Sequence, residues 1–267
     1  DAEEALILLM RALHEQGKNA EILALYKSRK AFFDKPEKAD AFVFWHAFTM
    51  FELEKYDEAL KELGGFSKTY PSSEYSGRVL RLTAWNYLKT GKTNEAFQAF
   101  SDFDRAFGNT PEGGVNLIEW GKTLLAARKL EQAHEVLLRL VKMPPDQPVV
   151  QNGFYWYGLT LIEEKKWDEA ASTLLALAAN ARAKEDLRAE ALLAAAVPLN
   201  AVSKKDDALD ALRRGIELAK SPELKLKGEF DFAGYLIDLG RLEQGIPLLK
   251  ACISKVPANP MAETAQL

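Results

Sequence analysis

Side chains that could do chemistry are few in this chain, and none has the spacing of a catalytic or metal site. The chain has three histidines and one cysteine: His14, His46, His134 and Cys252. The histidines lack the metal-ligand spacing with cysteine or carboxylates that zinc sites show. Gly-Lys-Thr occurs at 91–93 and 121–123 without the glycine pattern of a phosphate-binding loop. We therefore predict no enzymatic activity, no cofactor and no metal, and we expect Cys252 to be a buried apolar side chain.

Composition narrows the function classes further. The 267 residues are 48% hydrophobic and 28% charged, which is enough apolar surface for a folded core. The net charge of −4 argues against a general role in binding nucleic acid. No apolar run reaches the roughly 18 to 20 residues that cross a bilayer. Since the chain starts at Asp1 and has no signal segment, we expect both ends to be boundaries within a longer protein.

One position recurs along the whole chain and shows how the elements are organised. Its occupants are 37 residues apart, once 38: Ile22, Ala59, Ala96, Ala133, Ala170, Ala208 and Gly245. A fixed period of this length is typical of a solenoid, in which each unit packs mainly on its neighbours. A second small residue precedes most of them: Ala47, Ala84, Gly121, Gly158, Ala196 and Ala233. We expect these small residues to lie where two helices of one unit cross, opposite larger ones such as Leu137 and Leu174.

Residues 77–110 illustrate a single unit. Apolar residues at helical spacing predict a first helix: Leu80, Ala84, Tyr87 and Leu88. Gly91 favours the end of that helix, and Thr93 or Asn94 is expected to cap a second helix of roughly 13 residues. In a later unit, Pro198 is expected to kink or shorten the first helix. We therefore predict an all-α chain with two antiparallel helices per unit.

This pattern resembles the tetratricopeptide repeat (TPR) family. Its units have small residues at positions 8 and 20, a bulky residue at 24 and proline near 32, matched here by Gly121, Ala133, Leu137 and Pro145. The resemblance implies one domain over 1–267, a right-handed superhelical solenoid of about seven antiparallel helix pairs. The expected units are approximately 3–36, 40–73, 77–110, 114–147, 151–184, 189–222 and 226–259, with 260–267 as the start of a truncated eighth.

The segment 66–97 narrows the resemblance. It is similar to a subgroup of these repeats found in bacterial envelope proteins, which includes lipoproteins of outer-membrane β-barrel assembly and periplasmic partners of the Tol–Pal system. This similarity favours a location in the periplasm or cell envelope.

The TPR resemblance also predicts which side chains bind a partner. In this family the first helices line a concave groove, and positions 2, 5, 9 and 12 point into it. Carried over to this chain, these positions and one neighbour give a basic and aromatic patch: Arg78, Arg81, Trp85, Lys89, Lys122 and Tyr155. Such a patch can hold an acidic or C-terminal peptide segment. The two-asparagine clamp of some family members is absent, because Trp85 and Lys122 occupy the ninth positions.

A second candidate surface is an aromatic strip of Phe44, Phe48 and Phe51. A contiguous apolar strip can mark an interaction site, although aromatic residues at helical spacing are more often core. The same alternative holds for the basic patch, whose aromatic side chains would then be buried and whose cations would be solvated.

We therefore predict a non-catalytic protein–protein interaction scaffold that binds a partner segment in its groove, as part of a bacterial envelope protein or complex. Two alternatives stay open. Aromatic residues such as Trp85 and Tyr155 would also suit a module that binds glycan or peptidoglycan fragments. The chain could instead be a structural spacer or self-assembly module. The sequence defines neither the partner's identity nor the oligomeric state.

Overall fold

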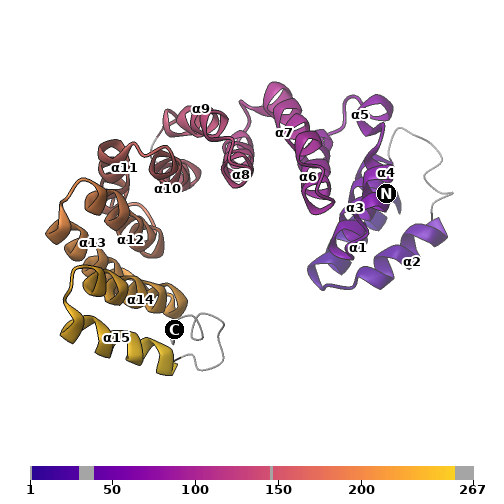
Figure 1. Cartoon of the computed structure of the whole chain (residues 1–267). Coiled ribbons are helices and arrows are strands. Elements are labelled where there is room, and N and C mark those ends of the chain that lie inside the picture. Colours follow the sequence, from indigo (N-terminus) through magenta and orange to yellow (C-terminus); the bar gives the residue numbers. More distant parts are fainter. Residues whose placement is uncertain (1, 30–38, 145–146, 256–267) are drawn as a thin grey trace. The chain divides into compact units, whose positions relative to one another are not determined.

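The computed structural model describes residues 2–29, 39–144 and 147–255, and every regular element in these ranges is an α-helix. This confirms the predicted all-α fold class. The helices follow one another in pairs (Figure 1). The pairs are α1 (Ala2–Glu15) with α2 (Asn19–Arg29), α3 (Asp40–Glu52) with α4 (Tyr56–Leu63), α6 (Ser76–Lys89) with α7 (Thr93–Phe107), α8 (Gly113–Ala126) with α9 (Leu130–Val141), α10 (Pro148–Glu163) with α11 (Trp167–Ala179), α12 (Glu185–Ala201) with α13 (Lys205–Leu218), and α14 (Pro222–Asp238) with α15 (Leu242–Lys255). A short helix, α5 (Phe66–Thr69), lies between α4 and α6.

The chain divides into two compact units, which we describe separately. The first unit is Asp1–Leu117 and the second is Ile118–Leu267. The division falls inside α8, and therefore inside one expected repeat, so the single domain over 1–267 stays a prediction. The expected start of an eighth repeat at 260–267 lies outside the described residues. Within the described ranges, no helix combines the length and apolar character that a membrane span needs.

The same turn joins the two helices of every pair. One residue in each turn has a φ between 58° and 73°: Gly17, Glu54, Gly91, Arg128, Lys165, Ser203 and Gly240. The next residue is always lysine or arginine, and its N–H donates to the carbonyl five residues earlier at 2.8 or 2.9 Å. This left-handed helix end satisfies carbonyls that would otherwise lack donors. The carbonyl of the same lysine or arginine accepts from the residue four positions later, which is the recurring residue of the 37-residue period.

One local expectation is wrong, and a second is wrong in part. Helix α7 begins at Thr93, and its N-cap is Lys92 with no side-chain hydrogen bond, so neither Thr93 nor Asn94 caps it. The reason is that the turn at Gly91 places Lys92 at the helix start. Helix α12 continues past Pro198 to Ala201, so the expected shortening is wrong, while the expected kink stays a prediction. Pro198 removes one N–H donor of the helix, and only three helical residues follow it.

The small residues lie where helices of a pair cross, as the sequence predicts. Ala59, Ala96 and Ala133 have no exposed surface. A methyl group added at Gly121 would lie 2.5 Å from Cγ of Leu137, and one added at Gly158 would lie 2.6 Å from Cδ2 of Leu174. Both leucines are fully buried. The first and second helices can therefore approach this closely only where a side chain is missing.

Candidate functional site

Aromatic side chains of α3 and α6 form a continuous row in the first unit. Ring centroids lie 6.0 Å apart for Phe44 and Phe48, 6.4 Å for Phe48 and Phe51, and 6.2 Å for Phe51 and Trp85. His14 of α1 packs edge-on against Phe48 with a centroid distance of 4.8 Å. The aromatic strip and the basic patch, which the sequence suggests as separate surfaces, therefore meet where Phe51 contacts Trp85.

Two arginines of α6 stack on aromatic rings beside this row. The guanidinium carbon of Arg81 lies 5.2 Å from the ring centroid of Trp85, and that of Arg78 lies 5.5 Å from Tyr75. Tyr75 in turn packs against Phe44, with centroids 5.1 Å apart. A guanidinium is attracted to the negative face of an aromatic ring, and its N–H groups match a carboxylate. The aromatic rings thus hold two cationic groups beside the row.

The predicted residues of the first unit differ in how much of each side chain is exposed. Phe44 is 6% exposed and belongs to a core cluster with Ala47 and Leu63. Phe48, Phe51, Trp85 and Arg81 are half-buried, whereas Arg78 and Lys89 are exposed. The aromatic row is therefore core at its Phe44 end and surface from Phe48 onward. We call Phe48, Phe51, Arg78, Arg81, Trp85 and Lys89 the first-unit surface.

A small cavity of about 190 Å³ adjoins the first-unit surface. Arg78 and Arg81 line it together with Phe103 and Phe107 of α7, and two acidic residues, Glu74 and Glu112, complete its wall. With two cations and two carboxylates, the cavity itself has no net charge preference. The preference of the surface for an acidic partner therefore rests on the arginines beside the aromatic rings and not on this cavity.

The remaining two predicted residues, Lys122 and Tyr155, lie in the second unit. Lys122 extends over Trp156, with its Nζ 5.1 Å from the ring centroid and 3.2 Å from Oε1 of Glu119. Tyr155 is half-buried. Burial, together with the negative charge of Glu190, raises the pKa of Tyr155 to about 12. Its hydroxyl is therefore protonated at neutral pH.

Sequence reasoning missed two of the rings that position these cations. Tyr75 lies under Arg78 and Trp156 lies under Lys122. The spacing of Tyr75 and Arg78, three residues apart, was a usable signal because such residues are neighbours on a helix surface. Trp156 and Lys122 come from different helices, α10 and α8, and no spacing in the sequence relates them.

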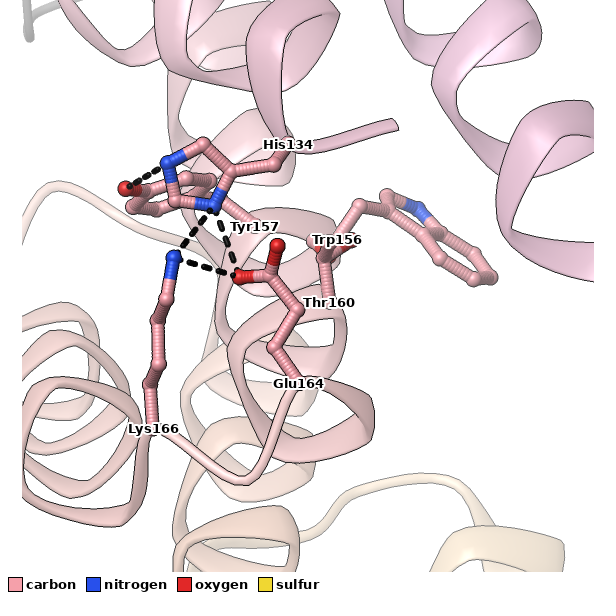
Figure 2. Close-up of polar contacts among 6 residues, drawn as sticks. All are labelled: His134, Trp156, Tyr157, Thr160, Glu164 and Lys166. Carbon is pink, nitrogen blue, oxygen red and sulfur yellow. Dashed lines mark hydrogen bonds and ion pairs between the residues drawn. The ribbon is translucent and has the colours of Figure 1, made fainter. Parts of the chain in front are cut away.

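In the second unit, the His134 ring contacts the polar groups of Tyr157, Glu164 and Lys166 (Figure 2). Its Nδ1 lies 2.8 Å from Oε2 of Glu164, and its Nε2 lies 3.3 Å from the Tyr157 hydroxyl. Nζ of Lys166 lies 3.0 Å from the same Glu164 oxygen. If the imidazole proton is on Nδ1, His134 donates to Glu164 and accepts from Tyr157. We call these four residues the His134 network.

The His134 network links two consecutive helix pairs. His134 comes from α9, Tyr157 and Glu164 from α10 and its C-terminal end, and Lys166 from the start of α11. Burial raises the pKa of Tyr157, so its hydroxyl is no ready nucleophile. Within the described ranges, no three histidine, cysteine or acidic residues gather closely enough to hold a metal ion. The geometry is that of a structural contact between repeats.

The sequence matches no protein-family model and no curated protein. Solved structures do match. One is the C-terminal part of a TPR repeat-containing protein from Cytophaga hutchinsonii, with a TM-score of 0.67 and 17% identity over 97% of this chain and 98% of the other. The chain has a TPR-like fold.

Two further structures show the same fold. YrrB, described as a TPR protein with an unusual peptide-binding site, matches with a TM-score of 0.56 and 19% identity over 75% of this chain and 96% of its own. A chain of the APC/C hetero-tetramer Cut9–Hcn1 matches with a TM-score of 0.58 and 16% identity over 97% of this chain. The present chain spans only 47% of that protein's length. At these identities the likeness concerns the fold alone.

Proposed function

We propose that this protein is a non-catalytic interaction scaffold, whose first-unit surface binds a partner segment that carries an acidic group beside an apolar side chain. The observation that carries the proposal is the stacking of Arg81 on Trp85 next to the half-buried Phe48 and Phe51. The exposed Arg78 beside Tyr75 offers charge-assisted hydrogen bonds, and the neighbouring rings offer apolar contact. Arginine and aromatic residues are also the side chains that most often dominate the binding energy of an interface.

The fold supports the scaffold class. YrrB shows that a chain of this fold can have a peptide-binding site. We further propose that the protein acts in the bacterial cell envelope, because residues 66–97 resemble repeats of envelope proteins. Fractionation of cells that express the tagged full-length protein tests this location. Recovery with the cytoplasmic fraction alone would contradict it.

The binding proposal is tested with a displayed library of random 12-residue peptides, selected on the immobilised protein. We expect enrichment of peptides in which Asp or Glu lies near an aromatic or aliphatic residue. An enriched peptide is then labelled, and its affinity is measured by fluorescence anisotropy. Arg78→Ser combined with Arg81→Ser should weaken binding at least ~10-fold, since charge-assisted hydrogen bonds contribute about 1.5–3 kcal/mol each.

The matched control is Lys68→Ser combined with Arg105→Ser, which removes two exposed cations of the same unit, one from α5 and one from α7. Its affinity should stay within about twofold of the original, apart from long-range screening effects. Equal loss in both double variants, or selected peptides without acidic residues, would refute the proposal. Binding to a glycan array in place of peptides would favour a glycan-binding module.

Two exposed apolar side chains favour a second candidate, self-association. Leu8 of α1 is 57% exposed, although its repeat equivalent Leu82 is 1% exposed. Ile246 of α15 is 42% exposed, although its equivalent Leu209 is 5% exposed. These terminal faces correspond to faces that a neighbouring repeat covers inside the chain, so a second copy could stack on them head to tail.

Light scattering over a range of protein concentrations tests this second candidate. We expect an increase in mean mass with concentration, which Leu8→Glu or Ile246→Glu should abolish. Leu53→Glu, at another exposed leucine, is the control and should leave the association intact. A monomer at all concentrations would rule out stacking of copies.

A further inference from the structure

We infer that the second unit carries a separate interaction surface, and that its partner is a basic segment with an adjacent apolar side chain. The surface is built on α10, α12 and α14, the first helices of their pairs, which contact one another in sequence order (Figure 1). Its residues recur at helical spacing: Tyr155 on α10, Glu190 and Val197 on α12, and Lys227, Phe230, Asp231 and Gly234 on α14. We call them the second-unit surface.

The apolar part of this surface is open to solvent. Val197 is 53% exposed and Phe230 is 37% exposed, and neither lies on a terminal helix. A methyl group added at Gly234, one helical turn beyond Phe230, would meet no atom within 4 Å. The surface therefore exposes two large apolar side chains beside unoccupied space, which is where an apolar side chain of a partner can pack.

The acidic part consists of two half-buried carboxylates without partners. Glu190 and Asp231 have no hydrogen bond or ion pair within the described residues, unlike Glu163, which pairs with Arg128. Burial raises the pKa of both Glu190 and Asp231. A carboxylate that has lost part of its water and gained no donor is destabilised, and an approaching cation relieves that cost.

The charged groups around Glu190 and Asp231 indicate which charge the partner should carry. Lys227 is the cation that faces both carboxylates, and it partly offsets the effect of burial on each pKa. Asp186, from the first turn of α12, adds a further negative charge near Glu190. The Tyr155 hydroxyl, which also faces Glu190, is neutral. The group therefore contains three carboxylates and one lysine, so lysine or arginine side chains of a partner complement the surface.

This surface is opposite in charge to the first-unit surface and does not depend on it. Arg78 and Arg81 would repel the basic segment that Glu190 and Asp231 attract. The two proposals therefore predict different classes in the same peptide selection. Acidic peptides report on the first unit, and basic peptides report on the second.

The experiment uses the same displayed library of 12-residue peptides on the full chain at pH 7. We expect a second enriched class in which Lys or Arg lies near Leu, Ile or Phe. A labelled peptide of this class is titrated by fluorescence anisotropy. Glu190→Gln combined with Asp231→Asn should weaken its binding at least ~10-fold, as expected for loss of two charge-assisted contacts.

A matched control separates local contact from net charge. Glu135→Gln combined with Glu217→Gln removes the same charge from exposed second-helix positions of the same unit. This variant should bind the basic peptide within about twofold of the original, as should Arg78→Ser combined with Arg81→Ser. Val197→Ser combined with Phe230→Ser should weaken binding without changing its dependence on salt, because it removes apolar contact alone.

Three results would overturn the inference. One is the absence of basic peptides from the selection, which leaves the first-unit proposal intact if acidic peptides are still enriched. Another is an equal loss of affinity in the surface variant and the matched control. The third is an affinity that does not fall as the pH is lowered from 7 to 4, because protonation of Glu190 and Asp231, whose pKa values burial raises, weakens the attraction.

Discussion

Two glycines in first helices of the second unit should respond in opposite ways to the same substitution. Gly158 in α10 and Gly234 in α14 are both helix-interior glycines. A methyl group at Gly158 would lie 2.6 Å from Cδ2 and 2.7 Å from Cγ of Leu174, whereas one at Gly234 would meet nothing within 4 Å. The pair therefore separates the cost of close packing from the helix propensity of alanine.

The magnitudes follow from these distances. Replacing a helix-interior glycine by alanine where the methyl group meets no atom stabilises by roughly 0.5–1 kcal/mol, so Gly234→Ala should raise the free energy of unfolding by that amount. Gly158→Ala gains the same propensity but forces a methyl group into a packed contact, which costs about 1–3 kcal/mol. The two variants should therefore differ by about 1–3 kcal/mol, or ~2–12 °C in Tm for a chain of this size.

Thermal unfolding followed by circular dichroism measures this difference, and a second background makes the test stringent. Leu174→Ala alone should cost about 2–5 kcal/mol, because Leu174 is fully buried. In that background the clash is gone, so Gly158→Ala should become stabilising, as Gly234→Ala is. If Gly158→Ala lowers Tm equally with and without Leu174, contact between these two residues does not explain why position 158 is glycine.

Three further predictions concern the polar groups. His134→Ala should lower the free energy of unfolding in urea by about 1–2 kcal/mol, because it removes two hydrogen bonds of the His134 network. Tyr157→Phe removes one of them and should lower it by less. An unchanged free energy of unfolding in both variants would contradict the assigned network. Since the folded-state pKa of Glu190 is raised, the folded state binds its proton more tightly, and stability falls as pH rises through that pKa. Glu190→Gln should therefore raise Tm at pH 7 and leave it unchanged near pH 4. Lys92→Ala should change stability by less than about 0.5 kcal/mol, because its 3.3 Å ion pair with Asp57 is exposed.

The helix pairs could be predicted from the sequence because a backbone turn sets their period. The hydrogen bond from Ala96 N–H to the Lys92 carbonyl recurs in every unit, so a packing position and a turn position share one spacing. The lysine or arginine of each turn shares that spacing too, from Lys18 to Arg241. Its recurrence was readable and would have corrected the expected cap at Thr93 or Asn94.

The candidate site was less predictable, because helical spacing tells which face a residue occupies and not what covers it. Phe44 and Phe48 are one helical turn apart on α3, yet Phe44 is buried and Phe48 is half-buried. Tyr75, 31 residues further along the chain, covers Phe44 with a centroid distance of 5.1 Å. The contact of Phe51 with Trp85 likewise joins two repeats. Whether these two rings meet depends on how the neighbouring repeats pack, which helical spacing does not specify.

The contrast between the constant and the variable positions points to how this fold could select a partner. Where helices cross, each repeat has the same solution: a small residue such as Gly158 against a large one such as Leu174. On the first helices the side chains change from Arg78 and Arg81 in one unit to Glu190 and Asp231 in the other. If the first helices served only to pack against neighbouring repeats, their side chains would not need to change from positive to negative charge. Under the two proposals, opposite charges on the two surfaces would discriminate between partners, because the wrong charge would be repelled as well as the right one attracted.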